Sequence, residues 1–315
     1  VTKGYFHSSN NMIECNNVWR KENREVHKFL RAIGFSDITK KDLEMILDEV
    51  ITRPEIMKIT KDSEGNEFAE LSGSFAANAG ITVRGTYQED DSFHMDYYYP
   101  YVFGTSITTN EQIDVEKHAE KESYAGVCDE VNLGVTLIFY IQNVADYLAE
   151  TNRHLSKIHY GAMLAGLSTE GKILCPVVER KKNDVPAIQK NDRHNQLIAQ
   201  AREGDEDAIE SLTLEDMDTY ALLSQRVMKE DIFSIVKSTF MPFGIESDQY
   251  TVLGEIIDCV TMENKLTHEK LYGMKLLCNN IQFDVCINEK DLLGEPAIGR
   301  RFRGNVWMQG NLCLE

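Results

Sequence analysis

An arginine, a histidine and a carboxylate lie on two consecutive stretches in which polar and apolar residues alternate. Arg84 belongs to the first stretch, and His94 and Asp96 belong to the second. Together they could bind an anion or exchange protons with a substrate, because histidine titrates near neutral pH. Tyr98 follows at the same spacing, and His159 is a further candidate for this polar site. The alternative is an ordinary solvated face of an antiparallel sheet, which carries the same pattern.

A second group of candidate residues lies near the end of the chain. Arg300, Arg301 and Arg303 form a compact basic cluster, and Trp307 follows on the same predicted strand. Guanidinium groups form paired hydrogen bonds with phosphates and carboxylates, so the cluster could contact an acidic partner. The alternative is that these arginines pair with acidic side chains of their own neighbourhood, which contributes little free energy at a surface.

The common catalytic and cofactor-binding motifs are absent from the sequence. It contains no HExxH or CxxC zinc pattern, no GxGxxG turn and no Walker loop. We therefore expect no bound cofactor and no metal. The seven cysteines have no paired spacing, so we interpret them as reduced thiols. Cys286 lies on a predicted strand and is expected to pack in a core.

Length and composition indicate a globular protein of roughly two domains. The chain has 315 residues, 42% of them hydrophobic, and a formal net charge of −18. This negative charge repels phosphate backbones and argues against nucleic acid as a partner. No run of about 18 apolar residues occurs, and the first residues do not have the pattern of a secretory signal. We therefore predict a cytoplasmic protein that does not enter a membrane.

Two helices and a sheet are expected to position the first polar group. Residues 26–33 predict a short helix ended by Gly34, and a second helix begins after Thr39 and ends before Pro54. Residues 55–101 change to an alternating pattern, which predicts an antiparallel meander with one solvated face. The candidate polar site would lie on that solvated face.

The middle of the chain is less regular. Residues 134–148 carry apolar residues at helical spacing, although their β-branched start also permits a strand. Residues 157–180 predict a hairpin whose turn is the Ser-Thr-Glu-Gly sequence at 168–171. A polar linker follows at 181–194, and residues 195–241 predict several helices that lead to the C-terminal part.

The last quarter of the chain has the pattern of a small β-barrel. From Tyr250 to Cys313, short alternating segments follow one another with turns between them and no long helical segment. The long first segment carries Gly254, and the whole is similar to an OB-type barrel. Barrels of this kind commonly bind a ligand or a partner, although a fold by itself does not determine function.

These patterns together predict an α+β protein: an antiparallel sheet with packed helices, a helical connecting segment and a C-terminal OB-like barrel. The predicted parts are a flexible extension (1–25), an α+β antiparallel-sheet domain (26–180), a linker with a helical segment (181–245) and the barrel (246–315). We expect a non-enzymatic binding or scaffold protein whose barrel contacts a protein or a small molecule. The alternative is an enzyme of unfamiliar type that uses the Arg84, His94 and Asp96 face.

Several segments of the chain resemble an uncharacterised family of bacterial proteins. They are HKFLRAIGFSDI, LTLEDMDTY, DQYTVLGEI and FDVCINEKDLLGEPAIGRRFRGNVWMQG. The family is a domain of unknown function found mainly in clostridial Firmicutes, and the resemblance covers residues 26–315. It implies a bacterial, cytoplasmic protein, and it implies no activity, cofactor or catalytic residue.

Overall fold

The computed structural model describes five segments of the chain and a few positions between residues 197 and 212. The five segments are residues 26–118, 122–153, 161–176, 236–244 and 248–314. Several predicted features therefore lie outside the described residues. These are the extension at 1–25, His159, the linker at 181–194 and the helices predicted within 213–235.

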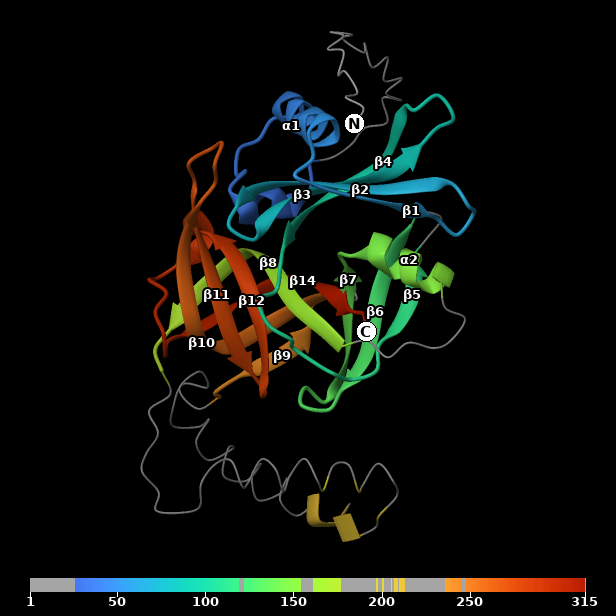
Figure 1. Cartoon of the computed structure of the whole chain (residues 1–315). Coiled ribbons are helices and arrows are strands. Elements are labelled where there is room, and N and C mark those ends of the chain that lie inside the picture. Colours follow the sequence, from blue (N-terminus) through green and yellow to red (C-terminus); the bar gives the residue numbers. More distant parts are fainter. Residues whose placement is uncertain are drawn as a thin grey trace, which may run out of the picture.

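Two β-sheets packed against each other form the described part of the protein (Figure 1). The smaller sheet is the predicted meander of four antiparallel strands. Its strands follow the chain: β1 (Ile56–Lys61), β2 (Glu67–Ala76), β3 (Ala79–Tyr87) and β4 (Phe93–Val102). The larger sheet has ten strands. They are β5 (Asp114–His118), β6 (Ser123–Glu130), β7 (Val135–Ile141), β8 (Gly161–Leu174), β9 (Thr239–Pro242), β10 (Gln249–Glu263), β11 (Lys270–Cys278), β12 (Ile281–Asn288), β13 (Leu292–Leu293) and β14 (Arg301–Cys313).

The two predicted N-terminal helices are confirmed. The first is the 3-10 helix η1 (Lys28–Ile33), which ends at Gly34 with a φ of 94°, a conformation that favours glycine. The second is α1 (Lys40–Thr52). The Thr39 hydroxyl caps α1 by accepting a hydrogen bond from the backbone N–H of Asp42 at 3.2 Å. A further short 3-10 turn, η2 (Glu289–Asp291), follows β12.

Neither face of the four-stranded sheet is open to solvent along its length, so the prediction of one solvated face is wrong. Helix α1 packs on β2 and β3 from one side. The helix α2 (Val144–Arg153) packs on β1 and β2 from the opposite side, where β7 also lies (Figure 1). Polar side chains of β3 such as Thr82 and Arg84 are therefore buried between the two sheets.

Of three further predictions for the middle of the chain, one is correct in part, one is wrong, and one is wrong at its end. Residues 134–148 divide into the strand β7 and the start of α2, so the strand alternative is correct for their first half. The hairpin predicted at 157–180 is wrong, because β8 runs without a turn through the Ser-Thr-Glu-Gly sequence. The helix predicted up to residue 241 is wrong at its end, where β9 begins at Thr239.

A β-bulge explains why residues typical of a turn lie inside strand β8. Ser168 pairs with Val306 and Glu170 pairs with Asn305, so Thr169 has no partner on β14. A bulge of this kind bends a strand and increases its twist. The bend lets the long strand β8 follow the curvature of the barrel described next.

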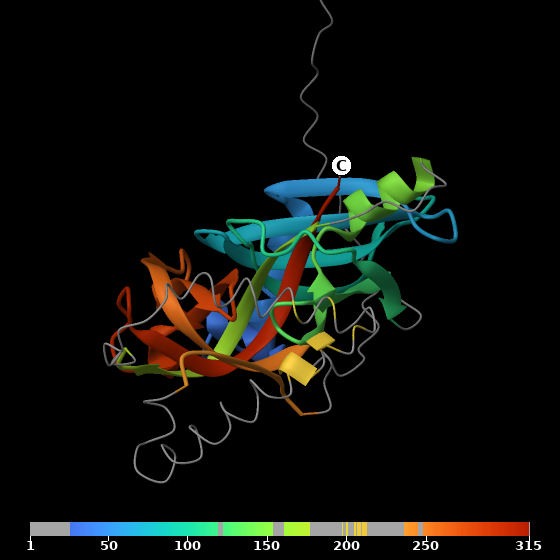
Figure 2. The same cartoon turned by 90° about the horizontal axis from the view of Figure 1, so that it is seen from below.

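Five strands of the larger sheet close into a barrel. Strands β10, β11 and β12 form an antiparallel meander, and β14 pairs with β10. Strand β8 closes the barrel because it pairs antiparallel with β14 and parallel with β12 (Figure 2). The barrel is thus not confined to residues 246–315, since one of its strands lies more than seventy residues earlier in the chain. The molecule is mostly β, with few helices among the described residues.

A fragment of residues 246–315 should therefore fail to fold by itself. Without β8, the edges of β12 and β14 lose their pairing and apolar residues of the barrel interior reach water. Adding residues 161–176 after residue 314 through a short turn should restore folding, because Cys313 already pairs with Gly161. Far-UV circular dichroism during thermal unfolding would test this. The added segment in scrambled order is the control, and a cooperative transition in the unextended fragment would contradict the prediction.

Candidate functional site

Arg84, the first residue of the predicted polar site, is fully buried and holds the two sheets together. Its Nε donates to Glu70 Oε1 at 2.8 Å, and its Nη1 donates to the hydroxyls of Tyr97 and Tyr140. Its Nη2 donates to the hydroxyl of Tyr99 and to the backbone carbonyls of Ile141, the last residue of β7, and Gln142. Burial by itself would lower the pKa of Arg84, but the surrounding tyrosines and the Glu70 carboxylate hold it above its ordinary value.

Glu70, the carboxylate that pairs with Arg84, also receives a hydrogen bond from helix α2. Its Oε2 accepts from the backbone N–H of Ala145 at 3.0 Å, in the first turn of the helix. A helix N-terminus carries a partial positive charge that favours a carboxylate. All donors of Arg84 are satisfied by the protein, so this arginine offers no hydrogen bond to a substrate.

A β-bulge separates the other residues of the predicted polar site from Arg84. Arg84 pairs with Tyr97 and Gly85 pairs with Met95, so Asp96 is an extra residue in β4. The side chains after Asp96 therefore face the opposite way from those expected by simple alternation. Tyr98 faces η1, where its hydroxyl accepts a hydrogen bond from the backbone N–H of His27 at 3.0 Å.

His94 is exposed and Asp96 is half-buried, and neither is among the hydrogen-bond partners of Arg84. The His94 side chain is 64% exposed, and its Nδ1 lies 3.6 Å from Asp96 Oδ1. None of the contacts of Arg84 involves either residue. The structure therefore does not bring the three candidate groups into one shaped site, and an enzyme site built on them receives no support.

The basic cluster near the C-terminus is also engaged by the protein itself. The Arg300 Nη1 donates to the carbonyl of Glu295, and the buried Arg301 donates to the carbonyls of Cys175 and Val236. Arg303 is half-buried on β14.

Trp307, predicted to contact a partner, is buried instead. It stacks on Phe29 of η1 with a centroid distance of 5.2 Å, and its indole N–H donates to Asp248. The covering of Trp307 by η1 means that this barrel face already has an occupant from the same chain.

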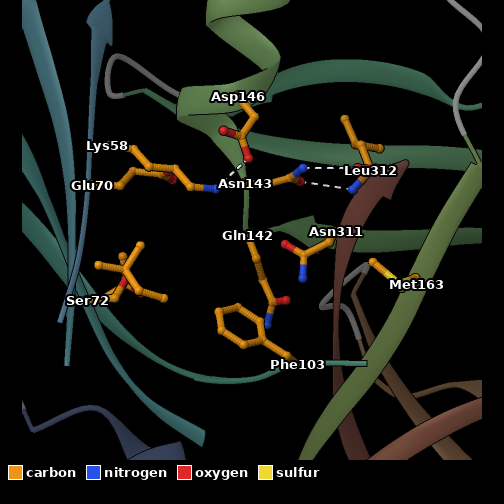
Figure 3. Close-up of a pocket in the computed structure, with 12 residues that line it drawn as sticks. Lys58, Glu70, Ser72, Phe103, Gln142, Asn143, Asp146, Met163, Asn311 and Leu312 are labelled. Atoms are coloured by element: carbon orange, nitrogen blue, oxygen red, sulfur yellow. Dashed lines mark hydrogen bonds and ion pairs between the residues drawn. The ribbon is translucent and has the colours of Figure 1, made fainter. Parts of the chain in front are cut away.

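The pocket between the two sheets is the strongest candidate for a ligand site (Figure 3). We call it the inter-sheet pocket. Its volume is about 310 Å³, and strands from both sheets and the start of α2 line it. The lining residues are Ile56, Lys58, Glu70, Ser72, Thr82, Phe103, Gln142, Asn143, Asp146, Met163, Asn311 and Leu312. Most of these were not predicted to lie in a site, because they come from seven separate parts of the chain.

Gln142, between β7 and α2, lines the inter-sheet pocket and carries a buried side-chain oxygen without a hydrogen-bond partner among the described residues. Its Nε2 donates to the carbonyl of Val102 at 2.9 Å and to Gln309 Oε1 at 2.7 Å. Gln309 in turn donates to the carbonyl of Pro100. These acceptors determine the orientation of both amides, since a flipped Gln142 would direct its oxygen at other oxygens. Gln142 is only 4% exposed, and its Oε1 has no hydrogen-bond partner among the described residues.

A buried carbonyl oxygen without a partner is destabilising by about 1–3 kcal/mol. Native proteins leave few such atoms, and they commonly mark places where water, an ion or a ligand binds. The position of Gln142 Oε1 in a pocket wall thus points to a bound hydrogen-bond donor. The only signal in the sequence is the polar Gln142-Asn143 pair, which interrupts an otherwise apolar run.

The charged groups of the inter-sheet pocket are all paired. Glu70 is neutralised by Arg84, and Lys58 Nζ lies 2.6 Å from Asp146 Oδ2 at the rim (Figure 3). The hydroxyls of Ser72 and Thr82 bond to each other at 2.8 Å. The remaining walls are largely apolar, as in most small-molecule sites.

A second hollow of about 380 Å³ lies between α1 and the turn that joins β10 to β11. It combines apolar side chains such as Phe35 and Met45 with acidic ones such as Asp42 and Glu49. The one buried polar side-chain atom left without a partner among the described residues lies in the inter-sheet pocket instead. We therefore place the candidate site in the inter-sheet pocket.

Three cysteine thiols of the described part of the chain, Cys128, Cys278 and Cys286, are buried. Burial raises the pKa of Cys128, Cys278 and Cys286 to about 12, which leaves these thiols protonated and unreactive. Cys286 packs in the core, as predicted, and its Sγ donates to the carbonyl of Ala32. Among the described residues, no three His, Cys, Asp or Glu side chains are grouped to hold a metal, and no helix could span a membrane.

The fold and the site define a mostly β protein in which a closed five-stranded barrel and an antiparallel sheet enclose a small pocket. The chain belongs to the family DUF3881, whose description is a domain of unknown function from an E. rectale gene and which matches residues 30–310. This confirms the resemblance to an uncharacterised bacterial family. No curated protein and no solved structure matches the chain.

Proposed function

We propose that this protein is a non-enzymatic binding protein whose ligand occupies the inter-sheet pocket. The observation that carries this proposal is the unsatisfied Oε1 of Gln142 in the pocket wall. The barrel contributes to this site through Met163 of β8 and Asn311 of β14. The pocket is thus a binding site that the barrel and the four-stranded sheet form together. Among the described residues that line it, the charges are paired and the hydroxyls are satisfied, so none of them is a free acid, base or nucleophile, which favours binding over catalysis.

We further propose that the barrel is of the OB type with a permuted strand order. In an OB-type barrel, a three-stranded meander is followed by a strand that pairs with the first, and by a last strand that runs parallel to the third. Strands β10, β11 and β12 correspond to the meander, and β14 pairs with β10. Strand β8 runs parallel to β12 and takes the place of the last strand, although it precedes the meander in the chain.

The barrel face on β8 and β12 is covered by η1, which supports the inter-sheet pocket as the binding site. Phe29 stacks on Trp307, and Asn264 donates to the carbonyl of Ile33. Asn288 donates to the carbonyl of Arg31. An external partner would have to displace these contacts before it reached the barrel surface.

We propose a reducing, cytoplasmic setting and a partner other than nucleic acid. Six cysteines among the described residues are free thiols, which persist in reducing compartments. The net charge of −18 supports a partner that is not a polyanion.

A screen of small molecules by thermal unfolding would test the binding proposal. A ligand present at about 100 times its dissociation constant should stabilise the native protein by about 2.7 kcal/mol. Met163→Trp should abolish that stabilisation, because an indole at this position would fill much of the pocket. Met241→Trp is the matched control, since Met241 is an exposed methionine on β9.

Two results would overturn this proposal. The first is that no compound stabilises the protein, or that Met163→Trp and Met241→Trp respond alike. The second is consumption of an excess of the bound compound, detected by mass spectrometry, which would identify an enzyme instead.

A further inference from the structure

We infer that the inter-sheet pocket takes a neutral amide carried on a flat ring, such as an aromatic carboxamide or a cyclic amide. This inference rests on the proposed binding function and specifies the chemistry of the ligand. It follows from three properties of the pocket: its hydrogen-bonding atoms, its charges and the shape of its apolar walls.

The amide side chains that line the pocket favour a ligand that carries both a hydrogen-bond donor and an acceptor. Gln142 Oε1 needs an N–H or O–H donor, since its own amide nitrogen is fully used by Val102 and Gln309. The Asn311 side chain also lines the pocket and makes no hydrogen bond within the described residues. Figure 3 shows the amides of Gln142 and Asn311 extending into the same part of the pocket. An amide ligand could donate its N–H to Gln142 and accept from Asn311 through its carbonyl.

The charges of the pocket exclude an ionised ligand. The two carboxylates that line it are bound, Glu70 by Arg84 and Asp146 by Lys58. A cation or an anion would leave water without finding an unpaired counter-charge, and such desolvation is strongly unfavourable. A neutral ligand avoids this penalty.

The size and the walls of the pocket favour a small ring. The volume of about 310 Å³ lies at the lower end of the range of about 300–1,000 Å³ that small-molecule pockets span. The Phe103 ring and the Met163 thioether line the space and offer contacts that suit the face or edge of an aromatic ring. Ile56 of β1 adds a further apolar wall.

Three compounds of nearly equal size test the inference: benzamide, benzoate and benzylamine. They share one ring and differ in carrying a neutral amide, an anion and a cation. Titration calorimetry should detect binding of benzamide, and both ions should bind at least about tenfold more weakly, which corresponds to about 1.4 kcal/mol. Uracil, a cyclic amide, should compete with benzamide.

Two variants locate the binding and one serves as a control. Gln142→Met and Asn311→Ala should each weaken benzamide binding about tenfold, through the loss of one hydrogen bond. Gln142 also bonds to β4, so replacing Gln142 could affect folding, and Asn311→Ala is included for this reason. The thermal unfolding of both variants is measured as well. Gln282→Met is the control, since Gln282 is an exposed glutamine on β12.

The outcomes separate this inference from the proposed function. The ligand class would be overturned, and the binding function would stand, if benzoate or benzylamine bound more tightly than benzamide. The same would follow if other compounds bound at the pocket and none of them was a neutral amide. Equal benzamide affinity in the wild type and in both pocket variants would also overturn it. If no compound binds at all, the proposed function fails, and the inference fails with it.

Discussion

Replacing Arg84 by methionine should lower the free energy of unfolding by about 3–5 kcal/mol, because it leaves the Glu70 carboxylate buried without its partner. The same change removes the donor to the carbonyls of Ile141 and Gln142, which hold β7 against the four-stranded sheet. Three tyrosine hydroxyls lose their donor as well. Urea unfolding at neutral pH, followed by tryptophan fluorescence, would measure the loss.

Two further variants separate the unpaired charge from the lost packing. Arg84→Met combined with Glu70→Leu should recover part of the loss, since a buried pair replaced by apolar side chains is often close to neutral. Arg84→Lys keeps the charge but cannot supply the five donors of a guanidinium group, so we expect a loss between those of wild type and Arg84→Met. A double variant no more stable than Arg84→Met would contradict this account.

The exposed ion pair at the pocket rim is the natural comparison for Arg84. Lys58 and Asp146 are both more than a third exposed, and a pair of this kind contributes about 0–1 kcal/mol. Lys58→Met should therefore change stability far less than Arg84→Met. Equal losses would mean that the effect of Arg84 does not come from burial.

Arg84 also connects the architecture of the protein to its candidate site. Its Nη2 donates to the backbone carbonyl of Gln142 at 2.8 Å, and the side chain of the same glutamine faces the pocket. Loss of Arg84 should thus disturb the position of the unsatisfied oxygen. A stable Arg84 variant should bind a pocket ligand more weakly, although Arg84 itself does not line the pocket.

Local features of this protein could be predicted from the sequence because their causes are local. The Thr39 cap, the Gly34 stop and the alternating strands of the meander depend on neighbouring residues only. Strands β10, β11, β12 and β14 could be located for the same reason. Their partner β8 could not be assigned to the barrel, because nothing near residue 161 indicates pairing with residue 313.

Two bulges account for the largest errors in the candidate site and in the strand assignments. Thr169 is the extra residue of the bulge in β8, where a hairpin turn was predicted instead of one bent strand. Asp96 as an extra residue reversed the faces of Tyr97 and Tyr98, so a single polar face was predicted where two exist. A bulge inserts one residue without any fixed sequence pattern, and it inverts every later side chain of the strand.

The inter-sheet pocket could not be predicted because it exists only after the two sheets pack. Gln142 looks like a polar residue at the end of an apolar run until Val102 and Gln309 orient its amide. The glutamine side chains of 142 and 309 act on β4 as a neighbouring strand would, by bonding its free backbone groups. That role depends on three segments that lie far apart in the chain.

Acidification should weaken the attachment of η1 to the barrel through His27. His27 caps η1, since its Nδ1 accepts from the backbone N–H of Phe29, and its ring lies 5.1 Å from that of Trp307. Burial, with a smaller contribution from Lys28, lowers the pKa of His27 to about 4 from an ordinary value of 6.5. Between about pH 6.5 and 4 the unfolded chain therefore binds a proton at His27 that the native protein does not.

The sign of the pH effect follows from this difference in pKa. The His27 contribution to stability is fully present above about pH 6.5 and is lost as the pH falls toward about 4. A difference of this size corresponds to as much as about 3 kcal/mol. His27→Asn keeps a capping acceptor but cannot titrate. The free energy of unfolding of the wild type should thus fall more steeply than that of His27→Asn between about pH 6.5 and 4.5.

Measurements at matched pH separate His27 from the carboxylates that also titrate under acid conditions. Urea unfolding of both proteins at each pH yields the difference between them, in which contributions from other groups cancel. Fluorescence of Trp307 should report the release of η1 in the wild type first, because the indole stacks on Phe29. A wild type that parallels His27→Asn at every pH would show that His27 has the same pKa in the native and the unfolded protein, and that the cap on η1 does not respond to acid.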